Sequence, residues 1–167
     1  MDLRGFVDSK REYTVGPTVF VNPRLGKKPY TFEVGGTDVT SLRNVIRDCH
    51  PVRKFFADKT LACTSENGRV CTSGEFEGEL CCPANRNNAT VDESNNWKRP
   101  ECQLRLKLYW SEGGNNYVME LPYMSARNFS NYVKKLADQK LDVTKVTTLI
   151  TIQECQSWGE CVFSAVE

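Results

Sequence analysis

Residues 102–121, CQLRLKLYWSEGGNNYVMEL, carry the clearest structural signal in the chain. Leu104, Leu106 and Leu108 alternate with polar, basic and aromatic residues, a period of two that is typical of a strand with one buried face. A turn with two glycines, 111–116, separates this strand from the apolar stretch 117–121. The segment therefore predicts a β-hairpin.

Downstream of the hairpin, the pattern changes to that of an amphipathic helix. Ser125 is a suitable N-cap, and the apolar residues after it recur at helical spacing: Ala126, Phe129, Tyr132, Val133 and Leu136. Residues 143–152 and 161–166 then predict two strands joined by a turn at 158–159. In that arrangement, Cys155 and Cys161 are expected to be neighbours on adjacent strands.

Upstream, strands at 18–21 and 28–34 predict an opening hairpin. A short helix is expected from Thr40 or Ser41 to residue 49, followed by an extended segment at 55–64. The whole pattern predicts a mainly β protein with minor α content, five to seven strands and one or two helices. We expect residues 1–167 to form a single OB-like domain, a small antiparallel barrel, with 63–102 as a cysteine-rich loop insertion.

Five of the eight cysteines lie between residues 63 and 102, in a stretch with little apolar periodicity. A loop of this length needs something to order it, and thiolates that converge on a structural zinc ion would do so. The ligand set that we favour is Cys63, Cys71, Cys82 and Cys102, with Cys81 or His50 as substitutes. The gaps are wider than in a standard zinc ribbon, and the alternative is a set of free or disulfide-linked thiols.

Composition excludes several function classes. The chain has one histidine and no glycine-rich phosphate-binding motif, so we expect a protein that is not an enzyme. With 22 Lys and Arg against 21 Asp and Glu, a nucleic-acid partner must meet a local basic face rather than a net field.

The sequence gives no sign of export or membrane insertion. The first residues lack the apolar run of a signal peptide, and no stretch of eighteen apolar residues occurs. We therefore expect a cytoplasmic protein without a membrane partner. A reducing compartment favours metal-bound or free thiols over disulfides.

Basic and aromatic side chains gather around the strand 103–110. If the leucines point inward, the residues between them share the opposite face, close to the end of the cysteine-rich stretch. The expected nucleic-acid-binding set is Trp97, Lys98, Arg99, Arg105, Lys107 and Tyr109. Cations that follow the phosphates and rings that stack on bases suit single-stranded DNA or RNA. The alternative is a protein-recognition module that uses the same aromatics as interface anchors.

The order of several motifs resembles a group of small phage and mobile-element proteins. The motifs are LACTSENG at 61–68, GELCCP at 78–83, EC at 101–102, LKLY at 106–109 and LP at 121–122 before a Ser-x-x-x-Phe helix. The group is similar to OB-fold single-stranded DNA-binding proteins with a zinc-pinned insertion. The resemblance covers about residues 60–136 and implies Cys63, Cys82 and Cys102 as shared ligands. Cys71 stands where such proteins usually have a glycine-rich turn. The resemblance further implies a phage or mobile-element protein that binds single-stranded DNA. Under the alternative of a protein-recognition module, the chain would be a phage-encoded inhibitor or adaptor.

Overall fold

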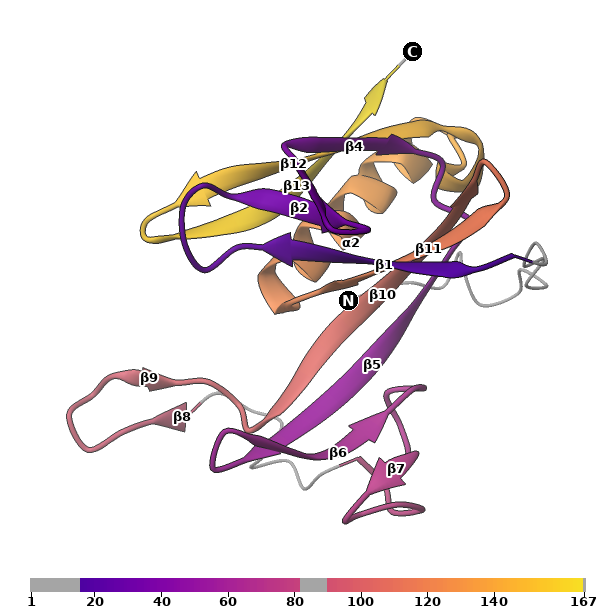
Figure 1. Cartoon of the computed structure of the whole chain (residues 1–167). Helices are drawn as coiled ribbons and strands as arrows, with labels where there is room; N and C mark the ends of the chain where they lie inside the picture. Colours follow the sequence, from indigo (N-terminus) through magenta and orange to yellow (C-terminus); the bar gives the residue numbers. More distant parts are fainter. Residues whose placement is uncertain (1–15, 82–89, 167) are drawn as a thin grey trace. The chain divides into compact units, whose positions relative to one another are not determined.

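The structure, a computed structural model, describes residues 16–81 and 90–166 (Figure 1). Its described parts are mainly β with one α-helix, which confirms the predicted class. The chain divides into two compact units, Met1–His50 with Lys107–Glu167 and Pro51–Leu106. It passes from the first unit to the second within β5 (Asp48–Ala57) and returns within β10 (Cys102–Glu112). None of the helices in the described ranges has the length and apolar character that crossing a membrane requires.

The larger sheet of the first unit contains both predicted hairpins. Its strands are β1 (Thr18–Arg24), β2 (Thr31–Val34), β3 (Thr37–Val39), β10 and β11 (Asn115–Leu121), in the order β3-β2-β1-β11-β10. The opening hairpin is confirmed by the antiparallel register of Val21 with Val34. β1 also runs parallel to β11, with Thr18 opposite Asn116, a pairing between segments far apart in the sequence.

A smaller sheet and the helix complete the first unit. The sheet has the order β13-β12-β4, formed by β13 (Trp158–Val166), β12 (Thr147–Cys155) and β4 (Ser41–Asn44). The 3₁₀ turn η2 (Val143–Lys145) precedes β12. Helix α2 (Tyr123–Asp138) buries four of the five residues of the predicted stripe, Ala126, Phe129, Tyr132 and Leu136, and leaves Val133 half-buried. The helix and the sheet meet where the Tyr132 hydroxyl lies 2.9 Å from Thr148 Oγ1. The rings of Phe129 and Phe163 also pack there edge to face, 5.1 Å apart.

Three local predictions were wrong. The segment expected as a helix from residue 40 to 49 forms β4 and the start of β5, because pairing of β4 with β12 outweighs the helical spacing of its apolar residues. The cap of α2 is Pro122, whereas Ser125 is buried inside the helix and accepts a hydrogen bond from the Cys161 amide at 2.9 Å. Cys155 lies opposite Trp158 rather than Cys161, which pairs with Ile152.

The second unit is built around the hairpin of β5 and β6 (Thr60–Ser65). β7 (Ser73–Gly74) adds to the edge of β6, and β8 (Thr90–Val91) pairs with β9 (Trp97–Lys98) as a separate hairpin. The stretch expected as a loop therefore contains short strands. The described sheets are open, so the OB-like barrel, the single domain and the insertion at 63–102 stay predictions.

Candidate functional site

The β8–β9 hairpin presents the first three residues of the expected nucleic-acid-binding set. Trp97 is 77% exposed, and Lys98 and Arg99 beside it are exposed as well. Val91 is the register partner of Trp97 across the hairpin. Successive residues of a strand point to opposite faces. The ring of Trp97 and the cations of Lys98 and Arg99 therefore lie on both sides of the same edge of the hairpin.

A compact turn holds this hairpin. The Asp92 carboxylate accepts hydrogen bonds from the amides of Ser94 and Asn96, each at 2.9 Å. Asn95 takes a left-handed conformation with φ of 63°, which asparagine tolerates better than most residues. The turn gives Trp97 a defined backbone although its side chain has little protein around it.

The other three expected residues lie on β10, where the predicted alternation is confirmed. Leu106 and Leu108 are fully buried and Leu104 is half-buried, while Arg105, Lys107 and Tyr109 lie on the opposite face. These three side chains are half-buried rather than open to solvent. Arg105 Nη2 donates a hydrogen bond to Gln103 Oε1 at 3.2 Å.

Tyr109 is engaged by the protein itself. Its hydroxyl lies 2.8 Å from His50 Nε2, and the two ring centroids are 4.7 Å apart. His50 Nδ1 lies 3.9 Å from Asp48 Oδ2. The sequence suggested His50 as a substitute zinc ligand, and the structure places it on β5 against Tyr109.

The six expected residues lie on two elements of the chain, the β8–β9 hairpin and β10. Trp97, Lys98, Arg99 and Arg105 belong to the second unit, and Lys107 and Tyr109 belong to the first. Of the set, Trp97 and Lys98 lie on β9 and Arg99 follows directly after it, and these three are exposed. The hairpin is therefore the best-defined candidate surface.

The expected zinc ligands gather in the second unit. Cys63, Cys71 and Cys102 are buried together with Phe55, and Cys81 packs against this cluster with Ala62 and Phe76. We call these seven residues the cysteine cluster. The Sγ atoms of Cys63 and Cys71 are 3.5 Å apart. Cys82, the fourth expected ligand, lies outside the described residues.

Backbone contacts bring the cysteines together from separate turns. The Cys71 amide donates to the Glu79 carbonyl at 2.8 Å, and the Cys81 amide donates to the Arg69 carbonyl at 2.7 Å. Gly74 lies opposite Cys63, where an added Cβ would stand 2.8 Å from the Cys63 Cα, so only glycine fits. These contacts hold the three chain segments that carry Cys63, Cys71 and Cys81 close to one another.

The thiols of the cluster suit a soft metal in kind but not yet in geometry. Burial raises the pKa of Cys81 and the neighbouring Cys71 raises it further, while the hydrogen bond with Ser65 and the charge of Arg53 offset part of this rise. Within residues 16–81 and 90–166, no three side chains are placed to hold one metal ion. The same residues contain no disulfide. Bound zinc would require four sulfur ligands around one point, with Cys82 or Cys81 to complete the set of Cys63, Cys71 and Cys102.

The comparisons with known proteins supply no family from which a function could be taken. No protein-family model, no curated protein and no solved structure matches it. The resemblance to phage proteins stays a prediction, and the case for a function rests on the residues themselves.

Proposed function

We propose that the chain binds single-stranded nucleic acid, with the β8–β9 hairpin as its primary contact. The observation that carries the proposal is the 77% exposure of Trp97 directly before two exposed cations, Lys98 and Arg99. Leaving an indole in water has no structural benefit, whereas a base stacked on it contributes roughly 1–3 kcal/mol. The two cations neutralise adjacent phosphates and release counterions.

In this proposal, the contacts follow the strand without reading its sequence. Trp97 stacks on a base, and Lys98 and Arg99 meet the phosphates on either side. Arg105, Lys107 and Tyr109 add contacts from β10. An OB-like barrel is the architecture that we propose around them, and the confirmed hairpins β1–β2, β10–β11 and β12–β13 support it.

We propose a structural zinc ion as part of the same design. Cys63, Cys71 and Cys102 would hold it together with Cys82, or with Cys81, which packs against the cluster. When bound, the ion supplies a rigid cross-link between turns. Support comes from the cysteine cluster, in which three of the four buried side chains are thiols and the fourth is Phe55. Thiols are the soft ligands that zinc accepts. The cytoplasm of a cell that carries a phage or mobile element is the proposed setting, and replication, recombination or genome defence is the proposed role.

The test is a fluorescence-anisotropy titration of labelled oligo-dT with the full chain at several salt concentrations. We expect affinity to fall steeply with salt. Trp97→Ala should weaken binding at least fivefold. The double variant Lys98→Ala with Arg99→Ala should weaken binding and also reduce, by about 1.4, the slope of the logarithm of the binding constant against the logarithm of salt concentration. Trp158→Ala, which removes another partly exposed tryptophan, is the matched control and should bind normally. An absence of binding at low salt would exclude the proposal.

A protein-recognition module is the second candidate, because other apolar side chains of the second unit are also exposed. Leu80 is 81% exposed and Val91, opposite Trp97, is 48% exposed. Such side chains anchor protein interfaces but add little to phosphate binding. A stoichiometric protein complex that survives nuclease, is lost in Trp97→Ala and is retained in the double cation variant would favour this candidate.

A further inference from the structure

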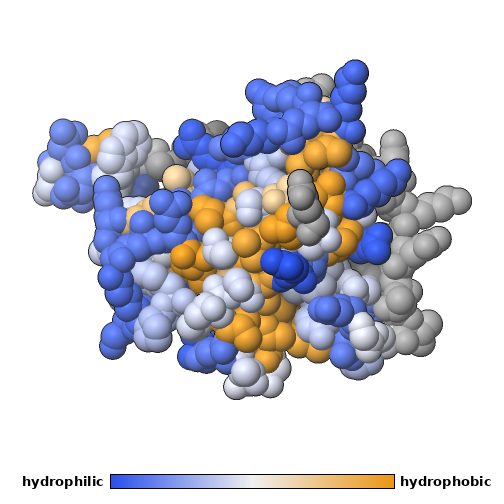
Figure 2. Space-filling model, turned by 90° about the horizontal axis from the view of Figure 1, so that it is seen from above, coloured by the Kyte–Doolittle hydropathy of each residue, from blue (hydrophilic) through white to orange (hydrophobic). Residues whose placement is uncertain are grey.

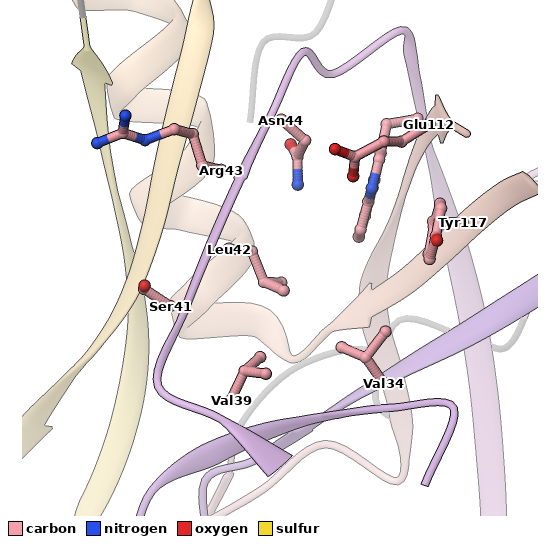
Figure 3. Close-up of a pocket in the computed structure, with 9 residues that line it drawn as sticks. Val34, Val39, Ser41, Leu42, Arg43, Asn44, Glu112 and Tyr117 are labelled. Atoms are coloured by element: carbon pink, nitrogen blue, oxygen red, sulfur yellow. The ribbon is translucent and has the colours of Figure 1, made fainter. Parts of the chain in front are cut away.

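A small pocket lies between β4 and the ends of β2, β3, β10 and β11, entirely within the first unit (Figure 3). Its volume is about 220 Å³, too small for a drug-sized molecule and suited to one ring system. Val34, Val39 and Leu42 supply an apolar wall. The parallel, stacked rings of Trp110 and Tyr117, 5.5 Å apart, also contribute to its lining.

One polar group in this pocket lacks a partner. Asn44 is only 8% exposed, and its Oδ1 atom has no hydrogen-bond partner among the described residues. An unsatisfied buried acceptor is unfavourable, so its presence calls for a donor that the chain itself does not provide. The alternation of β4 turns Leu42 and Asn44 toward the pocket and Ser41 and Arg43 away from it (Figure 3).

A second acceptor faces the first. The carboxylate of Glu112, an exposed residue at the end of β10, points toward the Asn44 amide (Figure 3). The pocket therefore combines two oxygen acceptors with an aromatic and aliphatic wall. A planar group that carries N–H donors on its edge satisfies both features.

We propose that this pocket, which we call the base pocket, binds a single nucleobase with an exocyclic amino group, namely adenine, cytosine or guanine. The inference rests on the proposed function and deepens it, because it adds base selection to contacts that only follow the strand. The exocyclic amine has two N–H donors, one for Asn44 Oδ1 and one for the Glu112 carboxylate, and Asn44 Nδ2 donates to a ring nitrogen or carbonyl. The Watson–Crick edge of thymine or uracil offers a single imide N–H, so these bases satisfy only one of the two acceptors and turn a carbonyl oxygen toward the other.

The test uses the full chain and free nucleosides, which report on the pocket without any phosphate contact. Calorimetric titrations with adenosine, cytidine and uridine should give saturable binding of the first two, and at least tenfold weaker binding of uridine. Asn44→Leu keeps the side-chain volume and removes the amide, so it should abolish this preference. Glu112→Gln, at an exposed position, should reduce it without a folding defect. Thr37→Ala, at an exposed position of β3 outside the pocket lining, is the control and should bind like the wild type.

Three results would overturn the inference: uridine binding as tightly as adenosine, a preference unchanged in both pocket variants, or no nucleoside binding at all. Competition by N-acetyl-arginine amide with inactive nucleosides would also overturn it, and would instead indicate a guanidinium group from a peptide. The two proposals fail separately. Oligo-dT binding that depends on Trp97 with no nucleoside binding rejects only the base pocket, and the reverse result rejects only the hairpin.

Discussion

The two units bury different kinds of side chain. In the first, α2 presses the rings of Phe129 and Tyr132 against β12 and β13, and Phe129 is completely buried. In the second, the buried members of the cysteine cluster are Phe55 and three thiols. A ring removes far more apolar surface from water than a thiol does. The cysteine cluster therefore gains less from hydrophobic burial than the core beneath α2, although the second unit also buries Val52 and Leu106.

The hydrophobic surface that remains exposed also belongs to this comparison. Figure 2 shows a continuous hydrophobic area, framed by hydrophilic side chains, on the face seen from above in Figure 1. The apolar wall of the base pocket belongs to the first unit. In the second unit, Leu80 and Trp97 are exposed one by one on short elements. A broad apolar area suits a preformed binding surface, and isolated anchors suit contact with a flexible partner.

Removal of the proposed zinc ion is the strongest test of the difference between the two units. We expect it to have the largest effect on their relative stability. Structural zinc contributes on the order of 10 kcal/mol in small metal-binding domains. Chelation or Cys63→Ser should therefore abolish hydrogen-exchange protection across residues 51–106 and leave α2 and β12–β13 protected. Elemental analysis of the purified chain should find one zinc per molecule.

The control for this prediction is Cys161→Ala, which removes a thiol buried in the first unit. This variant should keep its zinc and its protection at 51–106. The prediction is contradicted if the wild-type protein contains no metal and the second unit of Cys63→Ser has the same hydrogen-exchange protection as in the wild type. That result would show that packing alone orders the cysteine cluster.

Truncation of a core ring tests how strongly hydrophobic burial stabilises the first unit. Phe129→Ala should lower the free energy of unfolding by about 3–5 kcal/mol, because it empties a fully enclosed ring site against Phe163. Urea denaturation followed by circular dichroism measures this loss. Phe20→Ala, at a position 75% exposed, should change stability by less than about 0.5 kcal/mol. A loss below about 1.5 kcal/mol for Phe129→Ala would contradict a core centred on α2.

The smallest expected effect comes from one hydroxyl in the same core. Tyr132→Phe removes the contact with Thr148 Oγ1 and should cost about 0.5–1.5 kcal/mol near neutral pH. Burial raises the pKa of Tyr132, so the folded state holds the phenol proton more tightly than the unfolded state. This contribution is complete below the ordinary phenol pKa of about 10 and is lost as pH rises through the folded value.

The stability difference between wild type and Tyr132→Phe should therefore narrow above pH 10. Paired denaturation curves at pH 8 and pH 11 measure it, and the groups common to both proteins cancel. A difference that grows with alkaline pH would mean that the phenolate is favoured in the folded state, contrary to its burial.

Local periodicity predicted the elements whose partners are near in sequence. The strand at β10, the stripe of α2 and the hairpin β12–β13 were all visible because the side chains that share a face recur at regular spacing. Leu42 was misassigned for the opposite reason. Its strand β4 pairs with β12, about a hundred residues later, and no local pattern encodes that partner.

The candidate sites follow the same rule. Trp97, Lys98 and Arg99 were identified because they are adjacent in the chain, and the shared residue type indicated the cysteines before their positions were known. Asn44 and Glu112 were missed. The base pocket takes its lining from five strands, so no spacing in the sequence signals it, and an asparagine in a short polar segment is unremarkable until its burial is known.

The parallel pairing of β1 with β11 has a consequence for synthesis of the chain. Thr18 to Val21 take their partners from Asn116 to Met119, so the ribosome must release nearly all the intervening residues before this pairing exists. The complete second unit, Pro51–Leu106, emerges during that interval. Contacts of such long sequence separation slow folding. The order of emergence therefore gives the cysteine-containing unit time to acquire its structure while the first strand still waits for its neighbour.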